Sequence, residues 1–238
     1  MDEPTVGQRR ERDVEVVFDN MRLPGILGLP AGAQGVVLFA HGSGSGRASP
    51  RNSYVARVLQ DGGMATLLID LLTEEEAQDR RLVFDIDLLT ERLRGATAWL
   101  RQEPATAALK IGYFGASTGA AAALQAAAQE GASIGAVVAR GGRPDLALAY
   151  LPAVQAATLL LVGGADTPII PLNQEAYQRL TCVKELIIIP RATHLFEEPG
   201  ALEAVARQAR DWCAQYLPLA EAPPRPVGSE LPPPSPPA

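Results

Sequence analysis

The feature that most constrains the fold is a set of seven short apolar runs, most of them continuous rather than alternating in polarity. Strands that helices cover on both faces of a parallel sheet have this pattern. We therefore expect strands at residues 14–18, 36–40, 65–69, 110–114, 134–139, 158–162 and 185–189. A further strand at 22–29 should form an antiparallel pair with the first one.

Helical patterns lie between these runs, at residues 51–60, 82–101, 118–130, 172–180 and 200–216. Strands that alternate with helices of this length imply right-handed crossovers and an open, doubly wound sheet. The predicted fold is an α/β fold of three layers, with a mostly parallel sheet and helices on both faces. We expect residues 1–217 to form a single domain.

The C-terminal segment differs in composition from the rest of the chain. Nine of the residues from 218 to 238 are proline, with serine and glycine among them. Proline at this density blocks both helix and sheet and leaves too little apolar surface to pack. We predict that residues 218–238 form a disordered tail.

The composition excludes several classes of protein. With 47% hydrophobic and 20% charged residues, a chain of 238 residues can bury a large core without disulfides or structural metal. The net charge of −6 argues against a nucleic-acid or anionic-membrane partner, and no apolar run approaches the ~20 residues of a membrane span. Cys182 and Cys213 are too few and too far apart for a zinc site with paired spacing. Because charged residues interrupt the N-terminal segment, we expect no secretory signal and a cytoplasmic location.

Ligands of doubly wound sheets bind at the carboxyl ends of the strands. The segment that follows the run at 110–114 reads Gly115-Ala116-Ser117-Thr118-Gly119 and matches the G-x-S-x-G nucleophile elbow. In such an elbow the serine occupies a strained turn that exposes its hydroxyl, and small residues let strand and helix approach closely. An alanine-rich helical segment follows directly. The pattern therefore indicates Ser117 as a nucleophile.

A serine nucleophile requires a base, and the chain contains only two histidines, His41 and His194. Hydrolases with this kind of sheet have the order serine, acid, histidine, which selects His194. Asp166 follows a buried strand and precedes His194, so it is the first candidate for the acid that fixes the imidazole tautomer. Asp145, after the preceding strand, is a rival acid.

The loop after the run at 36–40 reads His41-Gly42-Ser43-Gly44. Backbone amides in such a glycine-rich loop can stabilise the negative charge that develops during acyl transfer. The amides of Ser43 and Thr118 are the expected oxyanion-hole donors. Nucleotide binding is disfavoured, because neither the Gly-x-x-x-x-Gly-Lys pattern nor Gly-x-Gly-x-x-Gly is matched.

Taken in order, the loop at His41-Gly42, the elbow, the Gly164-Ala165-Asp166 turn and the segment Thr193-His194-Leu195-Phe196 resemble the α/β-hydrolase superfamily. Over residues 14–217 the chain looks most like the dienelactone hydrolase family. The resemblance implies a hydrolase without cofactor or metal, with Ser117 as nucleophile, Asp166 as acid and His194 as base. Dienelactone hydrolases proper carry cysteine at the elbow, so the serine favours carboxylesterase activity over activity on dienelactone itself.

Only residues 141–157 separate two of the predicted strands, which leaves room for one short helix and no cap domain. An open site favours small, soluble substrates. His41, Arg140 and Arg191 are candidate substrate-binding residues. The arginines either brace loops by pairing with acids or hold a substrate carboxylate.

The sequence thus predicts a serine hydrolase that cleaves small carboxylic esters, lactones or thioesters through an acyl-enzyme intermediate. Its expected partner is a small-molecule ester, and we expect a monomer or homodimer. The alternative is a catalytically silent scaffold of the same fold that acts in binding or regulation.

Overall fold

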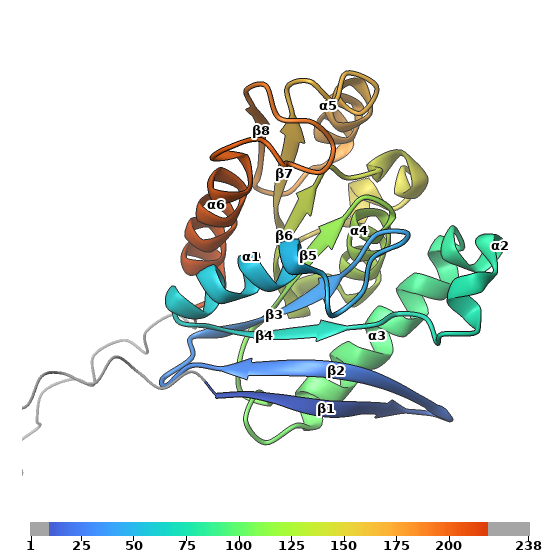
Figure 1. The fold of residues 1–238 in the computed structure, drawn as a ribbon, viewed down its shortest axis with the longest axis vertical. Helices are drawn as coiled ribbons and strands as arrows, with labels where there is room; N and C mark the ends of the chain where they lie inside the picture. Colours follow the sequence, from blue (N-terminus) through green and yellow to red (C-terminus); the bar gives the residue numbers. More distant parts are fainter. Residues whose placement is uncertain (1–9, 219–238) are drawn as a thin grey trace, which may run out of the picture.

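An eight-stranded sheet lies at the centre of the computed structural model, which describes residues 10–218 (Figure 1). In chain order the strands are β1 (Arg10–Phe18), β2 (Met21–Leu29), β3 (Gly35–Ala40), β4 (Met64–Ile69), β5 (Ile111–Ala116), β6 (Ile134–Arg140), β7 (Ala157–Gly163) and β8 (Lys184–Ile189). They are arranged in the order β1-β2-β4-β3-β5-β6-β7-β8. β2 is antiparallel to β1 and to β4, and all the other pairs are parallel. This confirms the predicted doubly wound sheet with an antiparallel hairpin at one edge.

Helices cover both faces of the sheet, so the structure has three layers (Figure 1). The helices are α1 (Pro50–Asp61), α2 (Arg80–Val83), α3 (Ile86–Gln102), α4 (Thr118–Glu130), α5 (Ile170–Arg179) and α6 (Ala201–Tyr216). Side chains of α1 and α6 share one apolar core with the sheet, and side chains of α3, α4 and α5 share the other. The β3–β4 crossover and the helix after β8 therefore lie on one face, and the other crossovers lie on the opposite face, as in a doubly wound fold.

The continuous apolar runs of the sequence correspond to strands with no solvent-facing side. Every residue of β3, β4, β5 and β7 is buried. In β8, at the edge of the sheet, only the last residue is buried, and the rest are partly or fully exposed. Burial on both faces removes the alternation that a one-sided sheet would impose on the sequence.

The prediction of one helix at 82–101 is wrong. The chain is helical in α2, leaves the helix at Phe84 and Asp85, and begins α3 at Ile86. The Asp85 side chain accepts a hydrogen bond from the Leu88 amide at 3.0 Å. Aspartate in this capping position stabilises a new helix start, because it satisfies an amide that has no partner within the helix.

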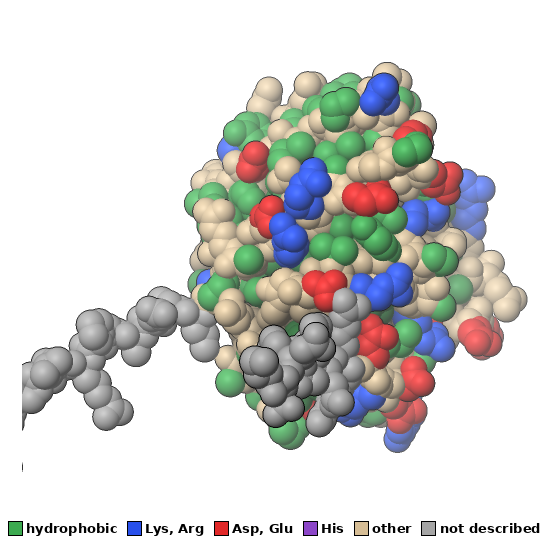
Figure 2. All heavy atoms as spheres, turned by 60° about the vertical axis from the view of Figure 1, so that its left-hand side comes forward, with side chains coloured by type: hydrophobic (Ala, Val, Ile, Leu, Met, Phe, Trp, Pro, Cys, Tyr) green, Lys and Arg blue, Asp and Glu red, His purple; other side chains and the backbone are tan. Residues whose placement is uncertain are grey.

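The surface on the side where α6 lies carries basic and acidic side chains interspersed with apolar and uncharged ones (Figure 2). None of the helices within residues 10–218 is long and apolar enough to cross a membrane. The predicted proline-rich tail, from 218 onward, lies outside the described residues except for Pro218.

Candidate active site

Ser117 occupies the turn between β5 and α4, where the strand ends one residue before it and the helix begins one residue after it. Its backbone has φ 52° and ψ −120°, a conformation that a non-glycine residue adopts only at a cost. Three main-chain hydrogen bonds hold it there. The Ser117 amide donates to the carbonyl of Arg140 at 3.2 Å, and its carbonyl accepts from the amides of Ala120 and Arg143 at 3.1 and 3.0 Å.

Two glycines allow this tight turn. A Cβ atom on Gly115 would lie 2.5 Å from the Cα of Ala120, and one on Gly119 would lie 2.1 Å from the carbonyl oxygen of Ala40. Both distances are far below van der Waals contact, so no other residue fits without moving the backbone. The glycines of the G-x-S-x-G pattern therefore meet the steric requirement from which the elbow was predicted.

His194 forms a hydrogen bond with Asp166, with 2.7 Å between Nδ1 and Oδ2. Asp166 follows β7 and is buried, with 9% of its surface exposed. An ionised carboxylate only accepts hydrogen bonds, so Nδ1 carries the proton and the lone pair of Nε2 is left as the acceptor. The arrangement gives His194 the tautomer that a general base needs.

Asp145, the rival acid, is engaged elsewhere. Its two carboxylate oxygens accept hydrogen bonds from the Nε and Nη2 atoms of Arg143 at 2.8 and 2.7 Å. These bonds raise the pKa of Arg143. The geometry thus pairs the histidine with Asp166, while Arg143 and Asp145 brace the loop after β6.

Gly141 brings the serine and the histidine to the same end of β6. It has φ 51°, and a Cβ atom there would lie 3.4 Å from both Nδ1 and Cε1 of His194. The preceding residue, Arg140, is the one whose carbonyl holds the Ser117 amide. Within residues 10–218, Ser117 Oγ makes no hydrogen bond to His194, a contact that commonly tightens only when substrate binds. Gly141 was not among the predicted site residues, although the Gly-Gly pair directly after a strand was a usable signal.

The loop after β3 packs against the elbow. A Cβ atom on Gly42 would lie 2.9 Å from the Cβ of Ser117, so the two segments are in contact. Thr118 is the first residue of α4, and its amide is one of those that have no acceptor within the helix. Ser43 and Thr118 line the same cavity. Both predicted oxyanion donors thus belong to segments that adjoin Ser117.

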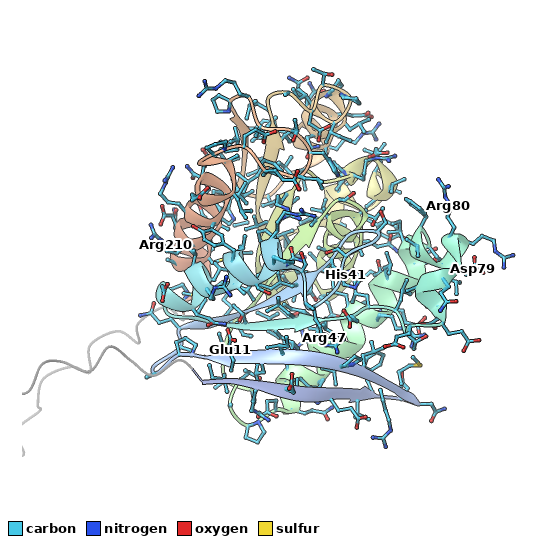
Figure 3. The ribbon with its side chains drawn as sticks, viewed as in Figure 1. Glu11, His41, Arg47, Asp79, Arg80 and Arg210 are labelled. Carbon is cyan, nitrogen blue, oxygen red and sulfur yellow. The ribbon has the colours of Figure 1, made fainter. Side chains whose placement is uncertain are left out.

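His41 lies directly after the end of β3 (Figure 3). Both of its ring nitrogens are engaged with the backbone. Nε2 accepts from the Leu71 amide at 3.0 Å, so Nδ1 carries the proton and donates to the Gly42 carbonyl at 3.1 Å. Arg47 adds a second connection, because its amide and guanidinium both bind the carboxylate of Asp70. His41 therefore fixes the loop after β3, which is the candidate oxyanion loop, to the end of β4.

A cavity of about 250 Å³ opens beside the oxyanion loop. The residues from His41 to Ser45, together with Thr118, form one side of it. An apolar wall comes from the segment between β4 and α3 and from α3 itself, through Leu72, Ala77, Val83 and Leu89. Sequence reasoning did not identify this wall, because its residues carry no motif.

Arg140 and Arg191 lie in different surroundings. Arg140 is 7% exposed, and its Cζ atom lies 6.0 Å from the centre of the Phe114 ring. Arg191 is exposed, has φ 63°, and borders a separate hollow beside Glu198. The two arginines therefore do not converge on one position. Within residues 10–218, no three His, Cys, Asp or Glu side chains come together to hold a metal ion.

A doubly wound sheet with a strained serine at a strand-to-helix turn, and a histidine bound to a carboxylate beside it, defines an α/β-hydrolase. The sequence profile of the dienelactone hydrolase family matches residues 23–219. The chain belongs to the dienelactone hydrolase family.

Two solved structures and one curated protein are similar to this chain. The crystal structure of a dienelactone hydrolase from Anabaena variabilis is 58% identical, covers 88% of this chain and 99% of its own, and superposes with a TM-score of 0.86. An esterase from Pyrococcus furiosus, at 19% identity, shares the fold with a TM-score of 0.74 over 88% of this chain and 92% of its own. A Mycobacterium tuberculosis protein that carries the name phosphoribosyl transferase is 53% identical over 208 residues, which are 87% of this chain and 47% of that protein. The chain thus spans about half the length of this curated relative.

Proposed function

We propose that this hydrolase cleaves small carboxylic esters, lactones or thioesters through a Ser117-His194-Asp166 triad. One observation carries the proposal: the hydrogen bond from His194 Nδ1 to Asp166 leaves Nε2 as a base beside a serine in the strained elbow conformation. Membership of the dienelactone hydrolase family supports hydrolysis in general. The serine at the elbow supports ester cleavage by an alkoxide-type nucleophile.

The reaction follows from these positions. Ser117 Oγ attacks the substrate carbonyl carbon while its proton moves to His194 Nε2. The amides of Ser43 and Thr118 donate hydrogen bonds to the oxyanion. The tetrahedral intermediate collapses, the leaving oxygen or sulfur takes the proton from His194, and an acyl-enzyme remains. Water then repeats the sequence, giving its proton to His194 and releasing the acid as Ser117 Oγ recovers the proton.

The cavity beside the oxyanion loop sets the size of the substrate. At about 250 Å³ it is just below the usual range for small-molecule sites, and one wall is apolar. Only two short 3₁₀ turns, Pro144–Ala147 and Leu151–Ala153, lie between β6 and β7. These features favour short acyl or alcohol groups. The name of the mycobacterial relative refers to a protein about twice as long, and we propose no phosphoribosyl transfer for this chain.

The test is a burst experiment with p-nitrophenyl acetate and butyrate. Wild type should release a burst of p-nitrophenol equal to the enzyme concentration, and a serine-directed phosphonate should label Ser117. Ser117→Ala should lose both the burst and the labelling. Ser133→Ala, at the opposite end of β6, is the matched control and should keep both. Undiminished turnover in Ser117→Ala would remove this serine from the mechanism, and a folded wild type that cleaves no ester would favour the silent scaffold.

A further inference from the structure

The guanidinium of Arg140 is buried without a counter-charge. The residue is 7% exposed, and within residues 10–218 its side chain makes no hydrogen bond or ion pair. Its Nη1 atom is inaccessible to solvent and has no acceptor. Burying an unpaired charge is costly, and folded proteins usually pair such a group or bind a ligand with it. An anion that neutralises Arg140 must therefore come from outside the described residues.

The backbone of Arg140 connects it to both candidate catalytic side chains. Its carbonyl holds the Ser117 amide, and the next residue, Gly141, packs against the ring of His194. The side chain extends over Phe114, toward the face of the sheet that α1 and α6 cover. The buried cation thus lies at the carboxyl end of β6, beside the site of the proposed chemistry.

A second cation comes from the first turn of α1. Burial and the nearby positive charge of Arg51 together lower the pKa of Arg140 to about 10, with burial the larger cause. Two other buried polar atoms in this turn, Nε of Arg51 and Oδ1 of Asn52, have no partner within the described residues. The first turn of α1 contains no acidic residue, and Ser49 makes no side-chain cap. The positive end of the α1 dipole therefore adds to the positive charge of the two guanidinium groups.

The carboxylates nearby do not neutralise Arg140. Glu197 binds Nη1 of Arg51 at 3.0 Å, with 63% of its side chain exposed. Glu198 accepts a hydrogen bond from the Thr193 amide at 3.0 Å. Glu197 and Glu198 are thus engaged away from Arg140, whose charge remains unpaired within the described residues.

We infer that Arg140 and Arg51, with the N-terminus of α1, form an anion-binding subsite, and that the ester substrate carries a carboxylate or phosphate group bound there. This inference rests on the proposed function, because it names the substrate class of the same site. Guanidinium groups match the oxygen geometry of both anions with paired, charge-assisted hydrogen bonds. The cavity with the apolar wall beside Thr118 would then hold the uncharged part of the substrate.

The kinetic test compares two esters of the same shape. In p-nitrophenyl hemisuccinate a carboxylate stands where p-nitrophenyl 4-methylpentanoate has an isopropyl group. The ratio of kcat/KM for the anionic ester to that for the neutral ester should fall at least ~10-fold in Arg140→Met and in Arg51→Gln, because charge-assisted hydrogen bonds are lost. Arg207→Gln removes one exposed charge from α6 and should leave the ratio unchanged.

A binding test separates the subsite from the chemistry. In Ser117→Ala, inorganic phosphate or succinate should raise the melting temperature, and adding Arg140→Met should abolish that rise. The anion with the larger effect identifies the source of the charge. Without added anion, Arg140→Met should melt no lower than the parent, because an unpaired buried charge has been replaced by an apolar side chain. A purely structural role of Arg140 would instead lower this temperature.

The outcomes are distinguishable. If both esters are cleaved and their ratio is the same in wild type and Arg140→Met, with no anion effect on melting, the subsite is refuted and the proposed function stands. If neither ester is cleaved but phosphate or succinate stabilises the protein only when Arg140 is present, the proposed function fails and the subsite stands.

Discussion

Replacing Asp166 by asparagine tests the core of the proposed mechanism, because it exchanges a carboxylate oxygen for an NH₂ group and leaves the shape of the side chain almost unchanged. In the structure the carboxylate accepts the proton of His194 Nδ1 at 2.7 Å. An asparagine amide can present its NH₂ group to Nδ1 instead. The imidazole would then carry its proton on Nε2 and could no longer accept one from Ser117.

The size of the effect follows from this change of tautomer. In trypsin the equivalent aspartate-to-asparagine change lowers kcat by about 10⁴-fold, which corresponds to about 5 kcal/mol of lost transition-state stabilisation. Stability should change little. The Asp166 amide donates to the Gly163 carbonyl at 3.0 Å, and its carbonyl accepts from the Ile169 amide at 3.0 Å. Both bonds belong to the main chain and survive the substitution.

Asp145→Asn is the matched control, since it makes the same chemical change in the rival acid. It weakens the partly exposed pair with Arg143, for which a loss of about 0.5 kcal/mol is typical. The assay is kcat on p-nitrophenyl butyrate together with the melting temperature of each variant. We expect a folded, nearly inactive Asp166→Asn and an active Asp145→Asn. An active Asp166→Asn beside an inactive but folded Asp145→Asn would refute the assignment of the acid.

Two further predictions concern ionisable groups away from the candidate site. Burial opposes ionisation of Glu130, but hydrogen bonds from Arg94 and Arg101 outweigh it and lower its pKa below the ordinary 4.5. Glu130→Gln should therefore cost about 1 kcal/mol of unfolding free energy at pH 7. Denaturant titrations should show that this difference shrinks as the pH falls below 4.5. A difference that stays constant with pH would contradict the ion pairs as its cause. Burial raises the pKa of the Cys213 thiol to about 12. A thiol reagent at pH 8 should therefore label Cys213 only after unfolding. Labelling of Cys213 in the native protein would contradict its burial.

The features that depend on local sterics and on continuous apolar runs could be predicted from the sequence alone. Continuous apolar runs located the strands, because a strand covered on both faces has no solvent side to encode. The elbow was readable for a similar reason. Gly115 and Gly119 occupy positions where any Cβ atom would overlap the backbone, so the pattern records a steric requirement. The capping residue Asp85 is also a local signal. The break before α3 was nevertheless missed, because apolar residues on both sides of Asp85 continue the helical period.

The features that depend on contacts between distant segments could not be predicted before the fold was known. The sequence order left two acids open, and the packing of the loop after β7 against the histidine loop pairs Asp166 with His194. The cavity arises where the segment after β4 folds against the oxyanion loop. The burial of Arg140 is the clearest case. An arginine is usually exposed, and only the packing of the folded chain around Arg140 removes it from water, because this burial depends on the surrounding segments and not on the residue itself.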